Sequence, residues 1–205
     1  MDPKAPQIVI RPAAEADADA VAAIIVDVLG DKYRPALGGA AAEGVAALVR
    51  RDLREQARAR YWVAEAEGRV AGGVHLALAD ETGADGARAL AEGVGWTRAL
   101  RATLVFGLLG EGAMTPDEAR VDELGVAGWA RRRGIAWSLL SACRDEAARL
   151  GKRRLTLWVT MDNGPARALY ERFGFREARR RRWLLGRLVF RAPGALLMEL
   201  PLPRR

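Results

Sequence analysis

The stretch VDELGVAGWARRRGIAWSLLSACRDEAARLG, residues 121–151, contains three successive arginines and then a glycine, at positions 131 to 134. The residues before the arginines predict a β-strand at about 120–127. The apolar residues after them have the spacing of a helix at about 136–150 that ends at Gly151. The arginines therefore lie in the turn between a strand and the start of a helix.

This turn has the chemistry of an anion-binding site. The first backbone N–H groups of a helix have no partner within the helix, and the helix dipole adds partial positive charge there. Gly134 would let an anion approach the backbone closely, and the arginines would add charge-assisted contacts to phosphate. The pattern G-x-x-x-x-G-K-[ST] does not occur, so nucleotide hydrolysis is not supported. On these residues alone, an ordinary helix start with solvated arginines is the competing interpretation.

The remaining segments have strand and helix patterns in turn. Further strands are expected at 7–11, 61–66, 70–79, 154–160, 175–183 and 195–200. Further helices are expected at 14–29, 41–59, 96–109 and 165–173, the last closed by Gly174. Loops are expected at 30–41 and over the rest of 82–112, with a hairpin turn at Glu67-Gly68 and a capped helical turn at Thr115. No linker divides the chain, so it predicts one α/β domain at 7–201 after a tail of residues 1–6.

The composition is that of an ordinary soluble globular protein. Half of the 205 residues are hydrophobic and 29% are charged. No apolar run approaches the ~20 residues that a membrane-spanning helix needs, and the first residues lack the pattern of a secretory signal. The single cysteine, Cys143, cannot form a disulfide within the chain. These features predict a cytoplasmic protein without a membrane partner.

The net charge of +7 is unevenly distributed. Residues 1–90 carry 11 basic and 14 acidic residues, and residues 91–205 carry 22 and 12. Such asymmetry is typical of proteins that bind nucleic acid, an anionic surface or a phosphorylated ligand. Lysine occurs only three times, however, and arginine this dominant beside so much alanine and glycine indicates genomic base composition. A nucleic-acid partner is therefore not expected.

Two motifs in the second half of the chain resemble the GNAT superfamily of acyl-CoA N-acyltransferases. The first is ELGV followed by RRRGIA, at 123–126 and 131–136. The second is NGPARALYERFGF, at 163–175. The two motifs occur in the family's order, separated by one predicted helix and one predicted strand. The resemblance implies a mixed, largely antiparallel central sheet flanked by helices.

The resemblance also implies acetyl-CoA as co-substrate. Backbone groups of two residues on the strand would bind its pantetheine arm as if it were another strand, with Gly125 between them marking a bulge. Residues of the turn and the helix start would surround the pyrophosphate, and one asparagine would contact the cofactor near the end of the next strand. The implied cofactor-binding residues are Leu124, Val126, Arg131, Arg132, Arg133, Gly134, Ile135, Ala136, Trp137 and Asn163.

Tyr170 is the candidate general acid. A phenol is protonated at neutral pH and can donate its proton to a departing thiolate. The competing interpretation is a half-buried tyrosine that anchors its helix. Some family members have a glutamate base on the strand before the asparagine, but Trp158 is the nearest residue here. Glu123 or Asp122 is therefore the candidate base, unless water serves or both are solvated strand-edge charges.

The predicted function is transfer of an acetyl group from acetyl-CoA to a primary amine by direct attack, without a covalent enzyme intermediate. The alternative is a non-catalytic acyl-CoA-binding or nucleic-acid-interacting module on the same fold. No metal site is expected, because His75 is the only histidine. We interpret His75 as structural, or as facing the acceptor, and Cys143 as a core residue. The acceptor, a small molecule or a peptide or protein amine, is not identified by the sequence. The oligomeric state is open, with a homodimer one option.

Overall fold

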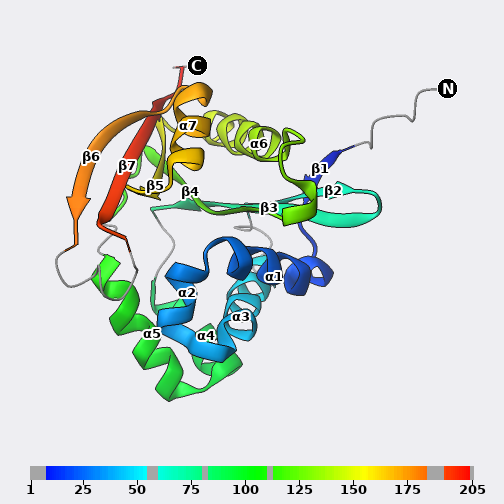
Figure 1. The fold of residues 1–205 in the computed structure, drawn as a ribbon, viewed down its shortest axis with the longest axis vertical. Helices are drawn as coiled ribbons and strands as arrows, with labels where there is room; N and C mark the ends of the chain where they lie inside the picture. The colour runs from blue at the N-terminus through cyan, green and yellow to red at the C-terminus, as the bar shows by residue number, and fades with distance from the viewer. Residues whose placement is uncertain (1–7, 55–59, 80–82, 110–112, 184–191, 204–205) are drawn as a thin grey trace.

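The computed structural model describes residues 8–54, 60–79, 83–109, 113–183 and 192–203, which form a single α/β domain (Figure 1). The strands are β1 Val9–Pro12, β2 Tyr61–Ala66, β3 Arg69–Leu78, β4 Glu118–Val126, β5 Arg154–Thr160, β6 Arg176–Arg182 and β7 Gly194–Pro201. The helices are α1 Ala18–Val28, α2 Gly30–Leu37, α3 Ala41–Arg54, α4 Gly83–Val94, α5 Trp96–Leu109, α6 Ile135–Arg149 and α7 Gly164–Phe173. Short 3-10 turns are η1 Glu15–Asp17, η2 Gly38–Ala40 and η3 Gly128–Ala130.

The strands form one mixed sheet in the order β1-β2-β3-β4-β5-β7-β6. Within the described residues, β4 and β5 are the parallel neighbours, and the other neighbouring pairs are antiparallel. The prediction of a mixed, largely antiparallel sheet is confirmed. Helices α1 to α5 cover one face and α6 and α7 cover the other, so the domain has three layers (Figure 1).

Each face of the sheet buries its own apolar core. The core on the α6 side contains Leu139, Leu140 and Cys143 together with the inward side chains of the strands, and Cys143 is fully buried, as predicted. The core on the other side joins α1 and α3 to Tyr61 and other residues of the sheet. Since the central strands are covered on both faces, they read in the sequence as nearly continuous apolar runs.

The two parallel strands separate after their first four residues. The paired residues run from Glu118, opposite Arg154, to Val121, opposite Leu157. Among the described residues, no later pair joins β4 to β5. Because β7 stays paired with β5 as far as Thr160, β5 keeps its place in the sheet while β4 diverges from it. The opening between these strands forms the site described below.

A bulge in β4 shapes this opening, and its position differs from the predicted one. Gly73 pairs with Gly125 but His75 pairs with Asp122, so β4 has one extra residue between these pairs. The bulge therefore includes Glu123, whose φ is 53°, and the prediction that Gly125 marks it is wrong. Gly125 instead allows α1 to approach, because a Cβ there would lie 3.1 Å from Ile25 Cδ1.

The N-terminal helices depart most from the prediction. The predicted loop at 30–41 is α2 followed by η2, and the predicted loop before 96 contains α4. Pro35 inside α2 and the glycines in both segments are typical of loops, but burial of Tyr33 and Leu37 stabilises α2. The predicted helix at 14–29 is η1 followed by α1. Residue 7 and residues 55–59, 82 and 110–112 of the predicted segments lie outside the described residues.

Two predicted turns have different outcomes. At Glu67-Gly68 both φ angles are positive, 56° and 68°, as a two-residue hairpin turn requires. At Thr115 a single turn forms, in which the Thr115 carbonyl accepts from the Glu118 N–H at 3.0 Å, but the Thr115 hydroxyl donates to the Asp117 carboxylate at 2.6 Å and the chain continues into β4. No helix among the described residues is long and apolar enough to cross a membrane.

Candidate functional site

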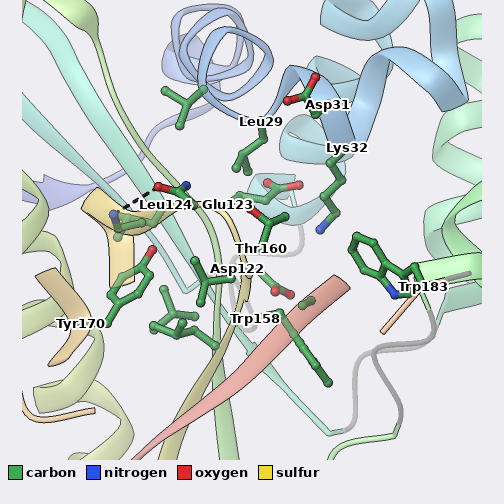
Figure 2. Close-up of a pocket in the computed structure, with 17 residues that line it drawn as sticks. Leu29, Asp31, Lys32, Asp122, Glu123, Leu124, Trp158, Thr160, Tyr170 and Trp183 are labelled. Carbon is green, nitrogen blue, oxygen red and sulfur yellow. Dashed lines mark hydrogen bonds between the residues drawn. The ribbon is translucent and has the colours of Figure 1, made fainter. Parts of the chain in front are cut away.

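A cavity of about 240 Å³ lies where β4 and β5 diverge (Figure 2). Both strands contribute to its wall, as do the start of α7 and the beginning of α2. Its lining residues are Val28, Leu29, Asp31, Lys32, Val121, Asp122, Glu123, Leu124, Leu157, Trp158, Val159, Thr160, Asn163, Ala166, Tyr170, Trp183 and Ala195. Four of the twelve sequence-predicted catalytic and cofactor residues line this cavity, namely Glu123, Leu124, Asn163 and Tyr170.

Tyr170 reaches the cavity from α7. The helix ends at Gly174, whose φ is 114°, and the Phe175 N–H donates to the Tyr170 carbonyl at 2.9 Å. This is the C-terminal capping motif that the sequence predicts. The Tyr170 ring contacts Phe175 edge-on, with centroids 6.0 Å apart. Burial raises the pKa of the Tyr170 phenol to about 12, so the hydroxyl is protonated at neutral pH and can act as a proton donor.

Asn163 begins the same helix. Its side-chain oxygen accepts from the backbone N–H of Ala166 at 3.2 Å, so Asn163 is the N-cap of α7. Asn163 also lines the cavity. The residue expected to contact the cofactor therefore has a structural role of its own, which is to start the helix that carries Tyr170.

Glu123 is held by two buried tyrosines. The Tyr61 hydroxyl donates to Oε2 at 3.1 Å, and the Tyr33 hydroxyl donates to Oε1. Burial and the nearby Glu123 carboxylate raise the pKa values of both phenols well above the ordinary value, so both remain donors. The left-handed backbone at the bulge turns this glutamate toward the helical layer of Tyr33, and its carboxylate still borders the cavity.

His75 and Asp52 lie behind this group rather than in the cavity wall. The His75 ring stacks on Tyr61 with centroids 5.4 Å apart, and His75 is buried. Burial raises the pKa of the Asp52 carboxyl, although the charges of His75 and Arg51 act in the opposite direction. The structural interpretation of His75 fits this position. Asp122, the other candidate base, pairs with His75 across the strands and lines the cavity.

The arginine turn lies at the N-terminus of α6. Gly134 is the N-cap in the left-handed region, with φ 81°, and Arg132 before it has φ 63°. The first backbone bond of α6 runs from the Ser138 N–H to the Gly134 carbonyl at 3.0 Å. The N–H groups of the preceding residues are therefore the ones that a helix leaves without internal partners. A Cβ on Gly134 would meet nothing within 4 Å, so the space before it is open.

Two of the three arginines form ion pairs across this turn. Arg131 contacts Asp27 at 3.4 Å and donates to the Val126 carbonyl at 3.3 Å, and Arg133 contacts Glu67 at 2.7 Å. These side chains are exposed, and exposed ion pairs typically contribute about 0–1 kcal/mol. Replacing the carboxylates of Asp27 and Glu67 with a phosphate as the partner of these arginines would therefore cost little free energy.

The remaining predicted cofactor residues differ in exposure. Ile135 is buried in the core, so only its backbone faces the turn. Trp137 is 42% exposed and its ring contacts Phe173 of α7 edge-on, with centroids 4.8 Å apart. Leu124 and Val126 pack against the α6-side core, while Ala136 lies in the first turn of the helix. The contact between Trp137 and Phe173 joins the N-terminal turn of α6 to α7.

Several site residues were not identified from the sequence. Tyr33 and Tyr61 come from α2 and β2, far from the two motifs, and only the fold brings them to Glu123. Lys32 and Trp183 line the cavity from opposite ends of the chain. No local pattern marks these positions. Within the described part of the chain, no group of three or more histidine, cysteine or acidic residues could hold a metal ion.

Comparisons with known proteins identify a matching family and similar solved structures. A family model described as "Acetyltransferase (GNAT) family" matches residues 31–175. No curated protein sequence matches the chain. Among solved structures, the chain is similar to ribosomal-protein-alanine N-acetyltransferase from Brucella melitensis, with 23% identity, a TM-score of 0.58, and coverage of 95% of this chain and 99% of that one.

Two further similar structures contain a cofactor. PaiA N-acetyltransferase from Thermoplasma acidophilum, in complex with coenzyme A, has 12% identity and a TM-score of 0.60, over 95% of this chain and 99% of that one. YncA from Salmonella typhimurium, with its cofactor acetyl-CoA, has 18% identity and a TM-score of 0.60, over 97% and 96%. At these identities the likeness shows the fold.

Proposed function

Because the chain belongs to the GNAT family of acetyltransferases, we propose that it transfers the acetyl group of acetyl-CoA to a primary amine in the cavity between β4 and β5. One observation carries this proposal. The two parallel strands diverge into a cavity that is lined by the phenol of Tyr170 and the carboxylate of Glu123, and the N-terminus of α6 follows β4 after η3 and the arginine turn. Acetyl-CoA would use both features, because its thioester would react in the cavity and its pyrophosphate would bind at the start of α6.

The donor would bind along the diverging strand and at the helix start. The pantetheine arm would use backbone groups of Leu124 and Val126, since β4 has no strand partner at these residues on its β5 side within the described residues. The pyrophosphate would meet the α6 N–H groups at Gly134, with Arg131 and Arg133 released from their surface ion pairs. Arg132, Ile135, Ala136 and Trp137 complete the proposed phosphate-binding turn.

The reaction is direct attack of an amine on the thioester. The acceptor's ammonium group loses one proton to the base, its nitrogen attacks the acetyl carbonyl carbon, and the carbon–sulfur bond then breaks. Tyr170 donates its proton to the departing sulfur, so that CoA leaves as the thiol. The acetylated nitrogen then loses its second proton, which restores the Tyr170 phenol, and the product is a neutral amide. The phenol is suited to this step because burial keeps it protonated, with a pKa of about 12.

Glu123 is the proposed base for the acceptor's proton. Each carboxylate oxygen accepts one phenol hydrogen bond, from Tyr33 or Tyr61, and each retains capacity for a further donor. An ammonium group or a water molecule in the cavity could fill that capacity. Asp122 also borders the cavity and is the competing candidate.

The experiment is a thiol-release assay with acetyl-CoA and a panel of primary amines. We expect release that depends on the amine and saturates with it, and an equal amount of acetylated amine in the product. The matched control omits the amine and measures thioester hydrolysis.

The alternative function is a non-catalytic acyl-CoA-binding module. It predicts acetyl-CoA binding by calorimetry together with no amine-dependent thiol release across the panel. That combination would overturn the transferase proposal and leave the cofactor site intact.

A further inference from the structure

Two tryptophans form one end of the cavity. Trp158 is on β5 and Trp183 follows β6, and both line the cavity with the small residue Ala195 between their strands. In Figure 2 Trp183 lies at one side of the cavity and Tyr170 at the other. The cavity therefore extends from the proposed proton donor to an aromatic wall that the acetyl transfer itself does not need.

The fold holds this wall firmly. The backbone N–H of Trp183 donates to the Pro193 carbonyl at 3.1 Å, which fixes the end of β6 against the start of β7. Gly194 permits this close crossing, because its φ is 156° and a Cβ there would lie 2.1 Å from the Arg181 carbonyl oxygen. Trp183 is only 9% exposed.

Helix α5 packs against the apolar cluster formed by Trp183, Ala192 and Ala195. Its residues Val105 and Phe106 contact this cluster, as does Trp158. Phe106 also contacts the ring of Tyr33 edge-on, with centroids 5.7 Å apart. The aromatic wall and the tyrosine that holds Glu123 are thus connected through one helix.

The charged residues of the cavity are mostly acidic. Asp122 and Glu123 come from β4, beside the proposed reaction centre, and Asp31 and Lys32 add one negative and one positive charge from the start of α2. Carboxylates therefore outnumber ammonium groups in the lining, which favours a positively charged acceptor such as a protonated amine.

The size of the cavity is also informative. Its volume of about 240 Å³ is below the roughly 300–1,000 Å³ of pockets for drug-sized ligands. An aminoglycoside or a folded peptide terminus would leave most of its body outside. A small flat molecule could place its amine near Glu123 and its ring against the indoles, where aromatic rings pack favourably.

We propose that the acceptor is a small primary amine with a flat aromatic body, which Trp158 and Trp183 bind. This inference rests on the proposed acetyl transfer and specifies its substrate class. In this class the amine carbon chain is short, so that the nitrogen reaches the thioester while the ring stays at the aromatic wall.

The test compares kcat/KM for four acceptors in the thiol-release assay: 2-phenylethylamine, ethylamine, spermidine and an alanyl peptide amide. We expect 2-phenylethylamine to exceed each of the others by at least about tenfold, because only its ring contacts the indoles. Equal or higher values for spermidine or the peptide amide would overturn the inference while the transferase function stands. An equal value for ethylamine would show that no aromatic body is recognised, with the same consequence.

Two tryptophan variants test whether Trp183 is responsible for the preference for 2-phenylethylamine. Trp183→Ala should raise KM for 2-phenylethylamine about tenfold or more and change that for ethylamine little. The matched control is Trp96→Ala, which removes an exposed tryptophan of α5 that does not line the cavity and should leave both KM values within about twofold. An equal rise in KM for both amines in folded Trp183→Ala would contradict the proposal that Trp183 binds the aromatic body of the acceptor.

Calorimetry of 2-phenylethylamine with the CoA-bound protein gives a readout that does not depend on transfer. Binding without turnover by any amine would reject the transferase function and retain the aromatic site. Absence of binding in the wild-type protein would reject the aromatic site, whatever the variants do.

Discussion

Tyr170 combines a position in the cavity with a phenol that stays protonated. Tyr170→Phe removes the proton donor and keeps the ring, so it should lower kcat by about 10²–10⁴-fold and leave KM for acetyl-CoA nearly unchanged. A tyrosine that only anchors α7 would instead lower the melting temperature and leave turnover normal. Both quantities can be measured on one variant, and a folded Tyr170→Phe protein with wild-type kcat would exclude the acid role.

The pH dependence has a defined sign. Burial raises the Tyr170 pKa to about 12, so the acid form persists at every pH below that value and is lost only as the pH rises through it. We therefore expect kcat not to fall between about pH 7 and pH 10, where an ordinary tyrosine with a pKa near 10 would begin to lose its proton. A decline within this range that is absent in Tyr170→Phe would contradict the raised pKa.

Glu123 and Asp122 can be distinguished by paired substitutions. Glu123→Gln retains an oxygen that can accept a phenol hydrogen bond but is not a base, and it should lower kcat by about 10²–10⁴-fold. Asp122→Asn is the matched control on the neighbouring residue and should have a smaller effect. Steady-state kinetics on both variants decide the matter, since a larger loss in Asp122→Asn would assign the base to that residue.

At this scale the sequence predicts residues within local motifs better than residues that meet through the fold. Tyr170 and its cap at Gly174 lie within one short motif, so their geometry could be predicted. Tyr33 and Tyr61 are 90 and 62 residues from Glu123 in sequence, and no pattern joins them. The bulge is expected at Gly125, which lies between the two residues predicted to bind the pantetheine arm, but the residue of β4 with positive φ is Glu123, an uncommon conformation for a residue other than glycine.

Helix α7 depends on a cap that the sequence associates with the cofactor. Asn163→Ala removes the oxygen that accepts from Ala166 and should lower the free energy of unfolding by about 0.5–2 kcal/mol. Asn163→Ser, the matched control, can still cap and should change stability less. Chemical denaturation measures both effects. Equal stability of wild type and Asn163→Ala would mean that the cap contributes nothing.

The same pair separates capping from cofactor contact. If Asn163 also contacts acetyl-CoA, calorimetry should show weaker binding in both variants, although only one of them is destabilised. Normal affinity in Asn163→Ser would limit the role of this residue to the helix.

The elements around the two motifs are those that the sequence predicts most closely. Strand β5 matches its predicted range of 154–160, and α6 differs by one residue at each end. Helices α2 and α4 were not predicted, because Pro35 and several glycines interrupt their patterns and tertiary packing decides them. These helices also belong to the layer that covers the proposed acceptor side of the sheet, where the least could be predicted.

At the scale of the whole molecule, the basic residues have a structural distribution that fits a small phosphorylated ligand. Arginines gather in the turn before α6 and along the edge strand β6, whose residues are all exposed. Charged side chains on an edge strand oppose pairing with another chain. The solvated interpretation of β6 is therefore sufficient, and it requires no nucleic acid.

This interpretation can be checked with a random-sequence RNA. We expect only weak binding that is lost near physiological salt, because a few surface arginines release few counterions. Fluorescence anisotropy over a salt series measures it. A submicromolar complex at physiological ionic strength would instead favour the nucleic-acid-interacting alternative.

Binding of acetyl-CoA at the start of α6 is tested most directly by calorimetry on Gly134→Val and Gly151→Val. Both glycines have positive φ, 81° and 70°, and lie at opposite ends of α6 with open space around them, so both variants impose similar backbone strain. Only valine at Gly134 obstructs the proposed phosphate site. We expect saturable binding to the wild-type protein and to Gly151→Val, and affinity at least about tenfold weaker in Gly134→Val. Equal affinities in the two variants, or no binding by the wild-type protein, would contradict the proposed acetyl-CoA site.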